Sequence, residues 1–269
     1  MIKKIILLTS TLWMMSLHAQ NKTDVTENET TESETIQSYK LSVNKGKLKI
    51  DLGRTTIEGY DGKEIIFSKK QTSKKVDERA KGLRAINANG LDDNTGLGIN
   101  VIEKNGIVEV VQLNRITPPN ISIKVPKAML IYFDHQSQFG STVTLRNLEN
   151  EIEVSTSYNS IVLENVTGPA TVNSIYGNID AKFSQNVKGP LSVVSIYGRV
   201  DVTIPKTVKA NVKASTSYGE ILVAPELPLK MESKSGMIRY NDQLNATLNE
   251  GGTGFTFRSD YGKIYLRAL

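Results

Sequence analysis

A short pattern centred on a tyrosine is written four times between Glu151 and Tyr218. The four tyrosines are Tyr158, Tyr176, Tyr197 and Tyr218. Asn follows the first of them, and Gly follows the other three. The copies are therefore 18, 21 and 21 residues apart. A fixed period of this size is typical of proteins that stack one structural unit on the next. No other feature of the sequence constrains the fold as strongly.

Apolar residues flank the tyrosine at fixed distances in every copy. They stand six and four residues before it, and three and five residues after it. Because successive side chains of a strand point to opposite faces, these positions predict two short strands that share one apolar face. One such unit cannot cover that face, so the units must stack on one another. We predict an all-β fold, a single-chain β-solenoid similar to a parallel β-helix, with repeats of about 18–21 residues.

Three further segments extend the series. Their corners are Tyr261-Gly262, Ser235-Gly236 in a unit that begins at Leu229, and Phe139-Gly140 in an earlier, imperfect unit. In that imperfect unit Phe133 stands six residues before the corner. A leucine-rich horseshoe has a compatible period, but its L-x-x-L-x-L pattern is absent. A β-sandwich would not explain the aligned copies.

The residues around the tyrosine have specific expected roles at a tight corner. The Gly after it is expected to supply a positive φ angle, and Asn159, which replaces this Gly once, tolerates that conformation well. Two residues before the tyrosine stands a Ser or a Thr, which predicts a buried ladder of hydroxyl groups. These residues are Thr156, Ser174, Ser195 and Thr216.

Stacking turns the tyrosines into a column that has two interpretations. In the first, which the alternation of inward and outward positions favours, the rings point inward and form a stacked aromatic ladder packed partly inside the corner. In the second, the column is an exposed aromatic strip that binds sugar rings or a protein partner. The candidate binding residues of this strip are Tyr158, Tyr176, Tyr197 and Tyr218, with Tyr261 further on.

The start of the sequence indicates export. Residues 1–19, with Lys3 and Lys4 before an apolar run, are expected to be a signal peptide that is cleaved after Ala19. Residues 20–37 are polar and are expected to form a disordered linker. The solenoid domain is then 38–269, with its first rung over residues 39–68, its first Gly turn at Lys45-Gly46 and an irregular insertion at about 70–100. The protein is expected in the periplasm, at the cell surface or secreted, and not spanning the membrane, because no later segment has about 20 apolar residues.

Composition excludes several classes of partner. The chain has no Cys, which excludes disulfides and thiolate metal sites. The formal charge of +5 falls to +3 when Lys3 and Lys4 leave with the signal peptide. This bias is too weak to indicate nucleic-acid binding. We expect no cofactor and no bound metal.

The sequence offers few groups for catalysis. His135, next to Asp134, is the one imidazole outside the expected signal peptide, and adjacency in one strand does not make a catalytic triad. Asp180 and Asp201 share the fourth position after the tyrosine and are expected to lie about 5 Å apart, where a pair of carboxylates could hold calcium. Residues 92–94 form a second calcium-like cluster. Both acidic groups are more simply interpreted as solvated surface, and the Gly96-x-Gly98 segment as a hairpin rather than a phosphate loop.

The repeats resemble the DUF4097 family of adhesin-like proteins of Bacteroidetes-type bacteria. The resemblance rests on the serial S-x-Y-G-x-I-x-V units from Ser155 to Leu266. It also rests on shorter motifs, which are I-E-G-Y-D-G at Ile57, K-G-L-R at Lys81, T-G-L-G-I at Thr95 and I-S-I-K-V-P at Ile121. Family members more usually have Asn-Gly at the corner, where this chain has Tyr-Gly. The resemblance implies an exported β-solenoid with adhesin-like character and carries no catalytic residues over.

These observations favour a non-enzymatic, exported, adhesin-like β-solenoid whose repetitive surface binds glycan or protein at the cell envelope. One alternative is a structural or regulatory envelope protein that docks a membrane-bound partner. Another is a polysaccharide-active enzyme on a β-helix scaffold, although a fold alone is a weak argument for a function. An exposed aromatic strip would favour glycan binding, a bare apolar edge would favour docking, and a cleft with converging carboxylates would favour the enzyme.

Overall fold

The computed structural model describes residues 35–71, 78–231 and 242–269. The expected signal peptide and the expected linker up to residue 34 lie outside these ranges. The described residues belong to one compact unit, Glu34–Leu269. Within the described ranges, no helix is long and apolar enough to cross a bilayer.

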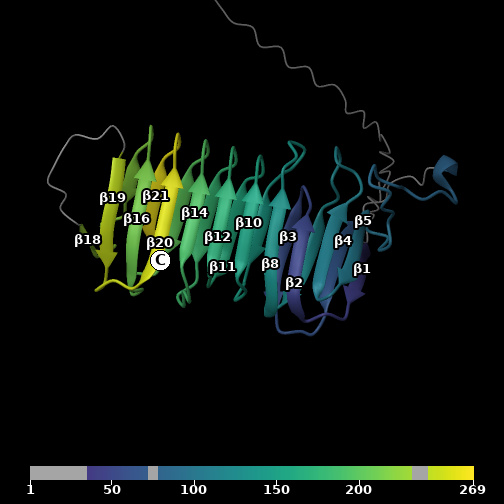
Figure 1. The fold of residues 1–269 in the computed structure, drawn as a ribbon, viewed down its shortest axis with the longest axis horizontal. Helices are drawn as coiled ribbons and strands as arrows, with labels where there is room; N and C mark the ends of the chain where they lie inside the picture. Colours follow the sequence, from purple (N-terminus) through teal and green to yellow (C-terminus); the bar gives the residue numbers. More distant parts are fainter. Residues whose placement is uncertain (1–34, 72–77, 232–241) are drawn as a thin grey trace, which may run out of the picture. The chain divides into compact units, whose positions relative to one another are not determined.

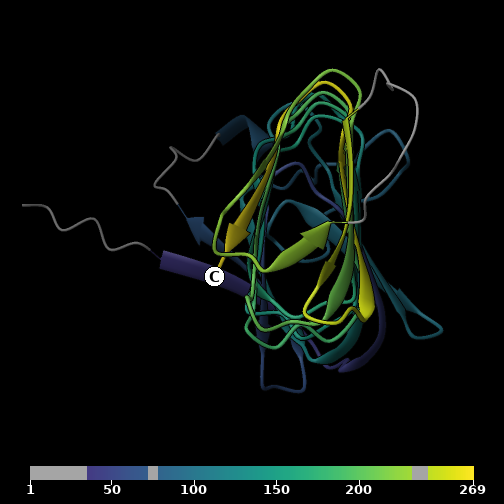
Figure 2. The same cartoon turned by 90° about the vertical axis from the view of Figure 1, so that its left-hand side faces the viewer.

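The unit is built from two facing sheets, as Figure 2 shows along the stack. The ten strands of sheet A are, in spatial order, β1 (Thr35–Leu41), β4 (Ile65–Gln71), β7 (Ile121–Pro126), β3 (Thr55–Tyr60), β9 (Val143–Arg146), β11 (Ile161–Val166), β13 (Ile179–Phe183), β15 (Val200–Ile204), β21 (Ile264–Ala268) and β17 (Ile221–Val223). The eleven strands of sheet B are, in the same direction, β5 (Ile99–Lys104), β6 (Ile107–Gln112), β2 (Lys45–Asp51), β8 (Ala128–His135), β10 (Ile152–Thr156), β12 (Ala170–Ser174), β14 (Leu191–Ser195), β20 (Thr253–Ser259), β16 (Ala210–Thr216), β19 (Asp242–Leu248) and β18 (Leu229–Met231).

A strand of sheet B, the corner after it and the next strand of sheet A together make one rung of the stack (Figure 1). Neighbouring rungs pair in parallel and in the register that the repeat predicts, with Ile152 opposite Ala170, Ala170 opposite Leu191, and Leu191 opposite Phe255. The predicted all-β solenoid is therefore confirmed. Each predicted apolar position has become a column along the stack.

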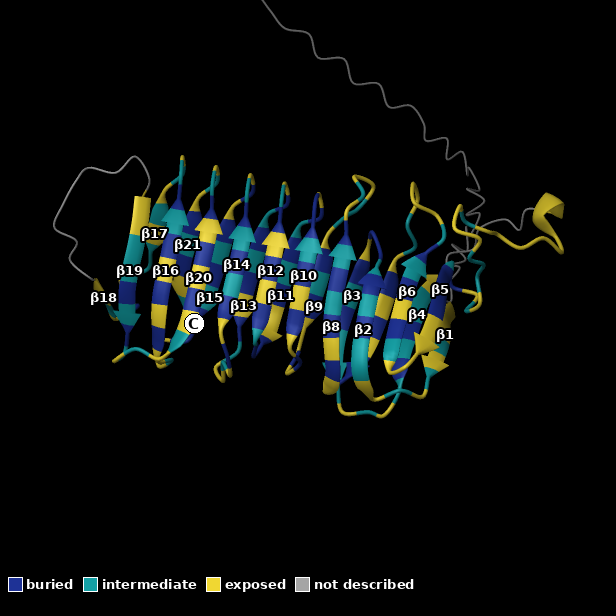
Figure 3. Cartoon of the chain, viewed as in Figure 1, coloured by how far each residue is buried: buried dark blue, intermediate teal, exposed yellow. Residues whose placement is uncertain are grey.

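The core lies between the two sheets and consists of these apolar columns. Buried and exposed residues alternate along the central strands, as in β12 and β20, and Figure 3 shows the alternation as bands. Side chains such as Val172, Val193 and Phe257 are fully buried. Burying a side chain of this size stabilises the fold by about 1.5–3 kcal/mol. Because each rung covers the apolar face of the next, the stack as a whole supplies this stability.

Chain order and spatial order differ at both ends of the stack. The last rung of the chain, β20 with β21, lies between β14 with β15 and β16 with β17. Near the N-terminus, β2 with β3 similarly lies between β6 with β7 and β8 with β9. The expectation that Tyr261 follows Tyr218 along the column is therefore wrong. The apolar pattern does not predict this exchange, because every rung involved places apolar residues at the same positions.

The ends of the sheets are antiparallel rather than solenoidal. β1 pairs with β4, β5 pairs with β6, and β18 pairs with β19. The unit expected from Leu229 is thus not a parallel rung over its described residues, and its corner at Ser235-Gly236 lies outside them. β1 begins at Thr35, so the last three residues of the expected linker are part of a strand.

The expected first Gly turn and the expected irregular insertion both lie in the first part of the chain. Lys45-Gly46 is the start of β2 rather than a corner, and the corner of this rung spans residues 52–54. The irregular insertion is present, since the described residues between β4 and β5 contain only a short 3-10 helix, Glu78–Ala80, and an isolated bridge between Ile86 and Asp92.

Candidate functional site

The predicted hydroxyl ladder forms inside the corners of the rungs. In the rung of β14, Ser195 is fully buried, and its Oγ accepts a hydrogen bond from the backbone N–H of Gly198 at 2.9 Å. The same Oγ donates to the carbonyl of Gly177 in the neighbouring rung at 3.0 Å. Ser174, Thr216 and Ser259 accept from their own corner glycines in the same way. The ladder therefore closes each corner and joins it to the next.

The corner glycines are required for close packing and not for a positive φ angle. None of the corner glycines after a ladder tyrosine, Gly177, Gly198, Gly219 and Gly262, is among the residues with positive φ, so that prediction is wrong. A Cβ atom at Gly198 would instead lie 2.1 Å from the carbonyl oxygen of Gly177. At Gly177 it would lie 1.9 Å from the carbonyl oxygen of Asn159. The stacking distance between rungs leaves no room for a side chain here.

The five candidate tyrosines form a continuous ladder of stacked rings on the outside of the corner. Ring centroids are 4.9–5.0 Å apart and the planes are 7–19° from parallel. The exposed fractions are 47–52% for four of the residues and 77% for Tyr218, so the prediction that the rings point inward is wrong. Along the stack, the order of the rings is Tyr158, Tyr176, Tyr197, Tyr261 and Tyr218.

The stacking decides which surfaces of the ladder a partner can reach. Each inner ring has a neighbour on both faces, so the ladder presents ring edges and phenol groups. Only Tyr158 and Tyr218, at the two ends, have one face without a ladder neighbour. A strip that stacks a sugar on every ring face is therefore excluded by this geometry, whereas an edge-on ridge with a polar group about every 5 Å is available.

Asn159 marks the point where the ladder ends. Its side chain is fully buried, and its Nδ2 donates to the carbonyls of Gly53 and Ser141 at 2.9 and 2.6 Å. The side chain occupies the space beside Gly140, in the rung of β8. The corner of that rung is longer, spanning residues 136–142, because β8 ends at His135 and β9 begins at Val143. Phe133 pairs with Val154, which stands four residues before Tyr158. The predicted alignment of Phe133 with the sixth position before the tyrosine is therefore wrong.

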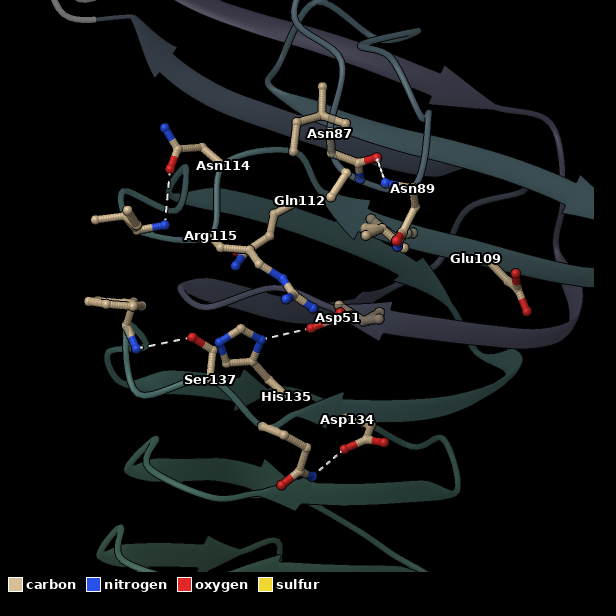
Figure 4. A pocket seen from close by; sticks show the side chains of 18 of the residues that line it. Asp51, Asn87, Asn89, Glu109, Gln112, Asn114, Arg115, Asp134, His135 and Ser137 are labelled. Carbon is tan, nitrogen blue, oxygen red and sulfur yellow. Dashed lines mark hydrogen bonds and ion pairs between the residues drawn. The ribbon is translucent and has the colours of Figure 1, made fainter.

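The longer corners enclose a pocket of about 1080 Å³ beside the end of the ladder (Figure 4). Its floor is the outer surface of sheet B at β2, β6 and β8. Its walls are three segments that leave or approach those strands, residues 85–89, 113–116 and 136–139. The repeat pattern does not predict this pocket.

His135 lies at the base of the pocket, in the column that holds Ser or Thr in the ladder rungs, opposite Thr156. It is 2% exposed, and its Nδ1 is 2.7 Å from Oδ1 of Asp51. Its Nε2 is enclosed and, among the described residues, has no hydrogen-bond partner. A Cβ at Gly53 would lie 3.2 Å from that nitrogen, so Nε2 faces the backbone rather than the pocket. A histidine that acts as a general base must contact its substrate through an unengaged ring nitrogen, and Nε2 of His135 is enclosed by the protein.

The polar residues of the pocket are ordered by contacts within its walls. Asn87 Oδ1 accepts from the N–H groups of Asn89 and Leu91, and Asn114 Oδ1 accepts from those of Ile116 and Thr117. Gln112, which is 4% exposed, accepts from the N–H of Gly53 at 2.7 Å. In each case the amide oxygen holds a loop or corner in place, so the amide nitrogen is the part available to a ligand.

The candidate calcium sites are occupied by protein contacts instead. Asp180 and Asp201 are paired in register, as predicted, but Arg199 binds the first at 2.7 Å and Arg267 the second at 2.7 Å. Asp93 accepts three backbone N–H groups, from Thr95, Gly96 and Gly98, and so holds a turn. Within the described ranges, no group of three His, Asp or Glu residues is placed to hold a metal ion.

The fold and the exposed ladder define a β-solenoid of the kind that carries repeated surface features. Residues 142–243 match the model of the Toastrack DUF4097 family, which confirms the family resemblance indicated by the repeats. No curated protein matches the chain.

Two crystal structures match the chain at low sequence identity. One is a "putative cell adhesion protein" from Clostridium sporogenes, with a TM-score of 0.47 and 12% identity over 88% of this chain and 100% of that one. The other is a "putative adhesin" from Bacteroides fragilis, with a TM-score of 0.27 and 9% identity over 88% of this chain and 98% of that one.

Proposed function

We propose that this protein is a non-enzymatic, adhesin-like binding protein of the cell envelope, which uses its tyrosine ladder to bind a long glycan or protein partner. The observation that carries the proposal is the ladder itself. Five aromatic rings in register, each about half exposed or more, are a costly surface for a protein to leave in water. Tyrosine is also enriched where proteins contact their partners.

The geometry of the ladder favours a partner with a repeated structure. The ridge offers ring edges and phenol groups at a constant spacing of about 5 Å along the stack. A phenol group both donates and accepts hydrogen bonds, so a row of them suits a chain of hydroxyl or amide groups. A small ligand would contact one or two rings and would gain nothing from the remaining length.

Export and the absence of catalysis are parts of the same proposal. The basic and apolar residues at the start of the sequence support export. The enclosed Nε2 of His135 supports a binding role over acid–base catalysis, because that nitrogen cannot reach a substrate. Three carboxylates line the pocket, and one oxygen of each is engaged by His135, Lys49 or Gln136, which supports a binding role for them over catalysis.

The test is binding of the purified protein to immobilised bacterial envelope polysaccharide and envelope protein fractions. The double variant Tyr176→Ser/Tyr197→Ser removes the centre of the ladder, and we expect at least about tenfold weaker binding, as for central interface aromatics. Tyr265→Ser is the matched control, because Tyr265 is on the outer face of sheet A and outside the ladder. Equal binding by the double variant and the control would refute a role for the ladder.

A further inference from the structure

We propose that the pocket beside the end of the ladder is a saccharide-binding site that accepts one or two uncharged sugar rings. This inference rests on the proposed binding function and narrows its ligand to carbohydrate. It concerns a different surface from the ladder, so the two can be tested separately.

The size of the pocket suits a ligand of this class. Its volume of about 1080 Å³ is slightly above the roughly 300–1,000 Å³ that is usual for small-molecule sites, which leaves room for two sugar rings. Three separate wall segments stand around a floor of paired strands, and side-chain to backbone hydrogen bonds within two of these walls order them. A preformed site of this kind avoids the entropy cost of ordering loops around a ligand.

Hydrogen-bond donors in the pocket come from amide groups whose oxygens are already engaged. Gln112, Asn87 and Asn114 each use the amide oxygen to hold the fold, and their NH₂ groups have no partner among the described residues. Gln112 is the strongest indication, because it is 96% buried and fixed by its bond to Gly53 while it lines the pocket. A fixed, buried donor that faces a cavity is a group that a ligand oxygen can satisfy.

The charges that line the pocket favour a neutral ligand over an anionic one, because the carboxylates outnumber the cations. Three carboxylates, Asp51, Glu109 and Asp134, face two cations, Lys49 and Arg115. One oxygen of each carboxylate is engaged within the protein, by His135, Lys49 and Gln136 respectively. The other oxygens can accept a hydrogen bond. Phosphate or a uronic acid would meet a lining with more negative than positive groups, whereas a sugar hydroxyl can accept from an amide NH₂ and donate to a carboxylate at the same time.

Exposed apolar side chains supply the surface that the C–H face of a sugar ring needs. Ile86, Ile116 and Phe139 line the pocket and are 56, 68 and 43% exposed. Phe139 is in the corner of β8 with β9, the rung directly beside that of Tyr158. A longer glycan with its end in the pocket would therefore continue toward the ladder.

In the experiment, the purified protein is titrated with N-acetylglucosamine, galactose, mannose and their β-linked disaccharides. Binding is measured by ligand-detected NMR. Glucuronate and inorganic phosphate are the anionic probes. Asn87→Asp and Asn114→Asp keep the oxygen that holds each loop and replace the NH₂ donor with a second, negatively charged oxygen. We expect a neutral sugar to bind, and each variant to weaken it about fivefold, the loss expected for one hydrogen bond.

Two controls and one further pocket variant make the outcome decisive. Asn186→Asp adds the same charge at an exposed turn outside the pocket and should bind like the parent protein. Phe139→Ala should also weaken binding, and it does not depend on the amide contacts. Tyr176→Ser/Tyr197→Ser should leave binding of the small sugars unchanged, although it weakens binding to envelope polymers.

The inference is overturned if no neutral sugar binds, if only glucuronate or phosphate binds, or if Asn186→Asp has the same effect as the pocket variants. If ladder-dependent binding to polymers persists in that case, the proposed function stands without the pocket. If sugars bind in the pocket and the ladder variant changes nothing, the pocket site stands and the ladder does not.

Discussion

The rungs that carry the tyrosine ladder and the rungs beside them share one core but differ at the corner. In a ladder rung, the corner is short, as at residues 175–178, and its glycine allows the next corner to lie directly against it. In the two rungs β8 with β9 and β6 with β7, the corners span residues 136–142 and 113–120. The short corners build a ridge and the long corners build a pocket. Corner length thus distinguishes the ladder rungs from the two rungs whose long corners, together with residues 85–89, form the walls of the pocket.

The largest expected effect tests the close packing of the short corners. Gly198→Ala places a Cβ 2.1 Å from the carbonyl oxygen of Gly177, and we expect a loss of about 3 kcal/mol in the free energy of unfolding. Gly254→Ala is the matched control, because a Cβ there meets no atom within 4 Å. Urea denaturation of both variants measures the difference. Equal stabilities would show that the glycines are not required for rung packing.

A smaller effect tests the order of the rungs. Tyr197 stacks on Tyr261 and not on Tyr218. A double-mutant cycle with Ala should therefore give a coupling of about 1 kcal/mol for Tyr197 with Tyr261 and close to zero for Tyr197 with Tyr218. The opposite result would mean that the rungs follow chain order and that Tyr261, not Tyr218, is the last ring of the ladder.

The smallest effect concerns the turns that lead from a strand of sheet A to the next strand of sheet B. There, one ion-pair cluster links the pocket rungs to the ladder rungs. Glu149 contacts Lys188 at 2.8 Å and Lys127 at 2.9 Å, and their hydrogen bonds lower the pKa of Glu149 from 4.5 to about 2. Because the folded-state pKa is lowered, the stabilisation is complete above about pH 4.5 and is lost as the pH falls toward 2.

An NMR titration of the Glu149 carboxyl group measures this shift directly. The pKa should lie well below 4.5 in the parent protein and rise in Lys188→Met. Since all these groups are exposed, the change in stability should be slight. An unshifted pKa in the parent would show that the cluster does not hold the two regions together.

The sequence predicts the columns of the core well, because the period of two inside each strand is a direct consequence of strand geometry. The same rule fails for the tyrosines. Tyr176 lies in the bend between β12 and β13, where the alternation of strand residues no longer applies, so its ring points outward. The prediction of buried serines is confirmed, because Ser174 is the last residue of its strand and still follows the alternation.

Other features depend on contacts between segments that are distant in the sequence. The place of β20 with β21 in the stack depends on how well the side chains of each rung pack against its neighbours, as Phe257 does opposite Ala214. The apolar pattern is the same in every rung and does not distinguish the alternatives. The pocket needs Asn87, Gln112 and Phe139 to come together from three separate segments. The exposed Phe139 at a Gly corner is the one local signal that this rung differs.

Exchange of a corner tests the central claim most directly. Residues 136–142 are replaced by Ile-Tyr-Gly-Asn, the corner of residues 175–178, together with Asn159→Gly and His135→Ser, so that the rung of β8 receives a ladder corner. The account predicts a folded protein with a sixth stacked tyrosine, seen as an increased near-ultraviolet circular dichroism signal, and loss of neutral-sugar binding. A folded chimaera that keeps the parent's tyrosine signal and its sugar binding would contradict the claim that corner length separates the ridge from the pocket.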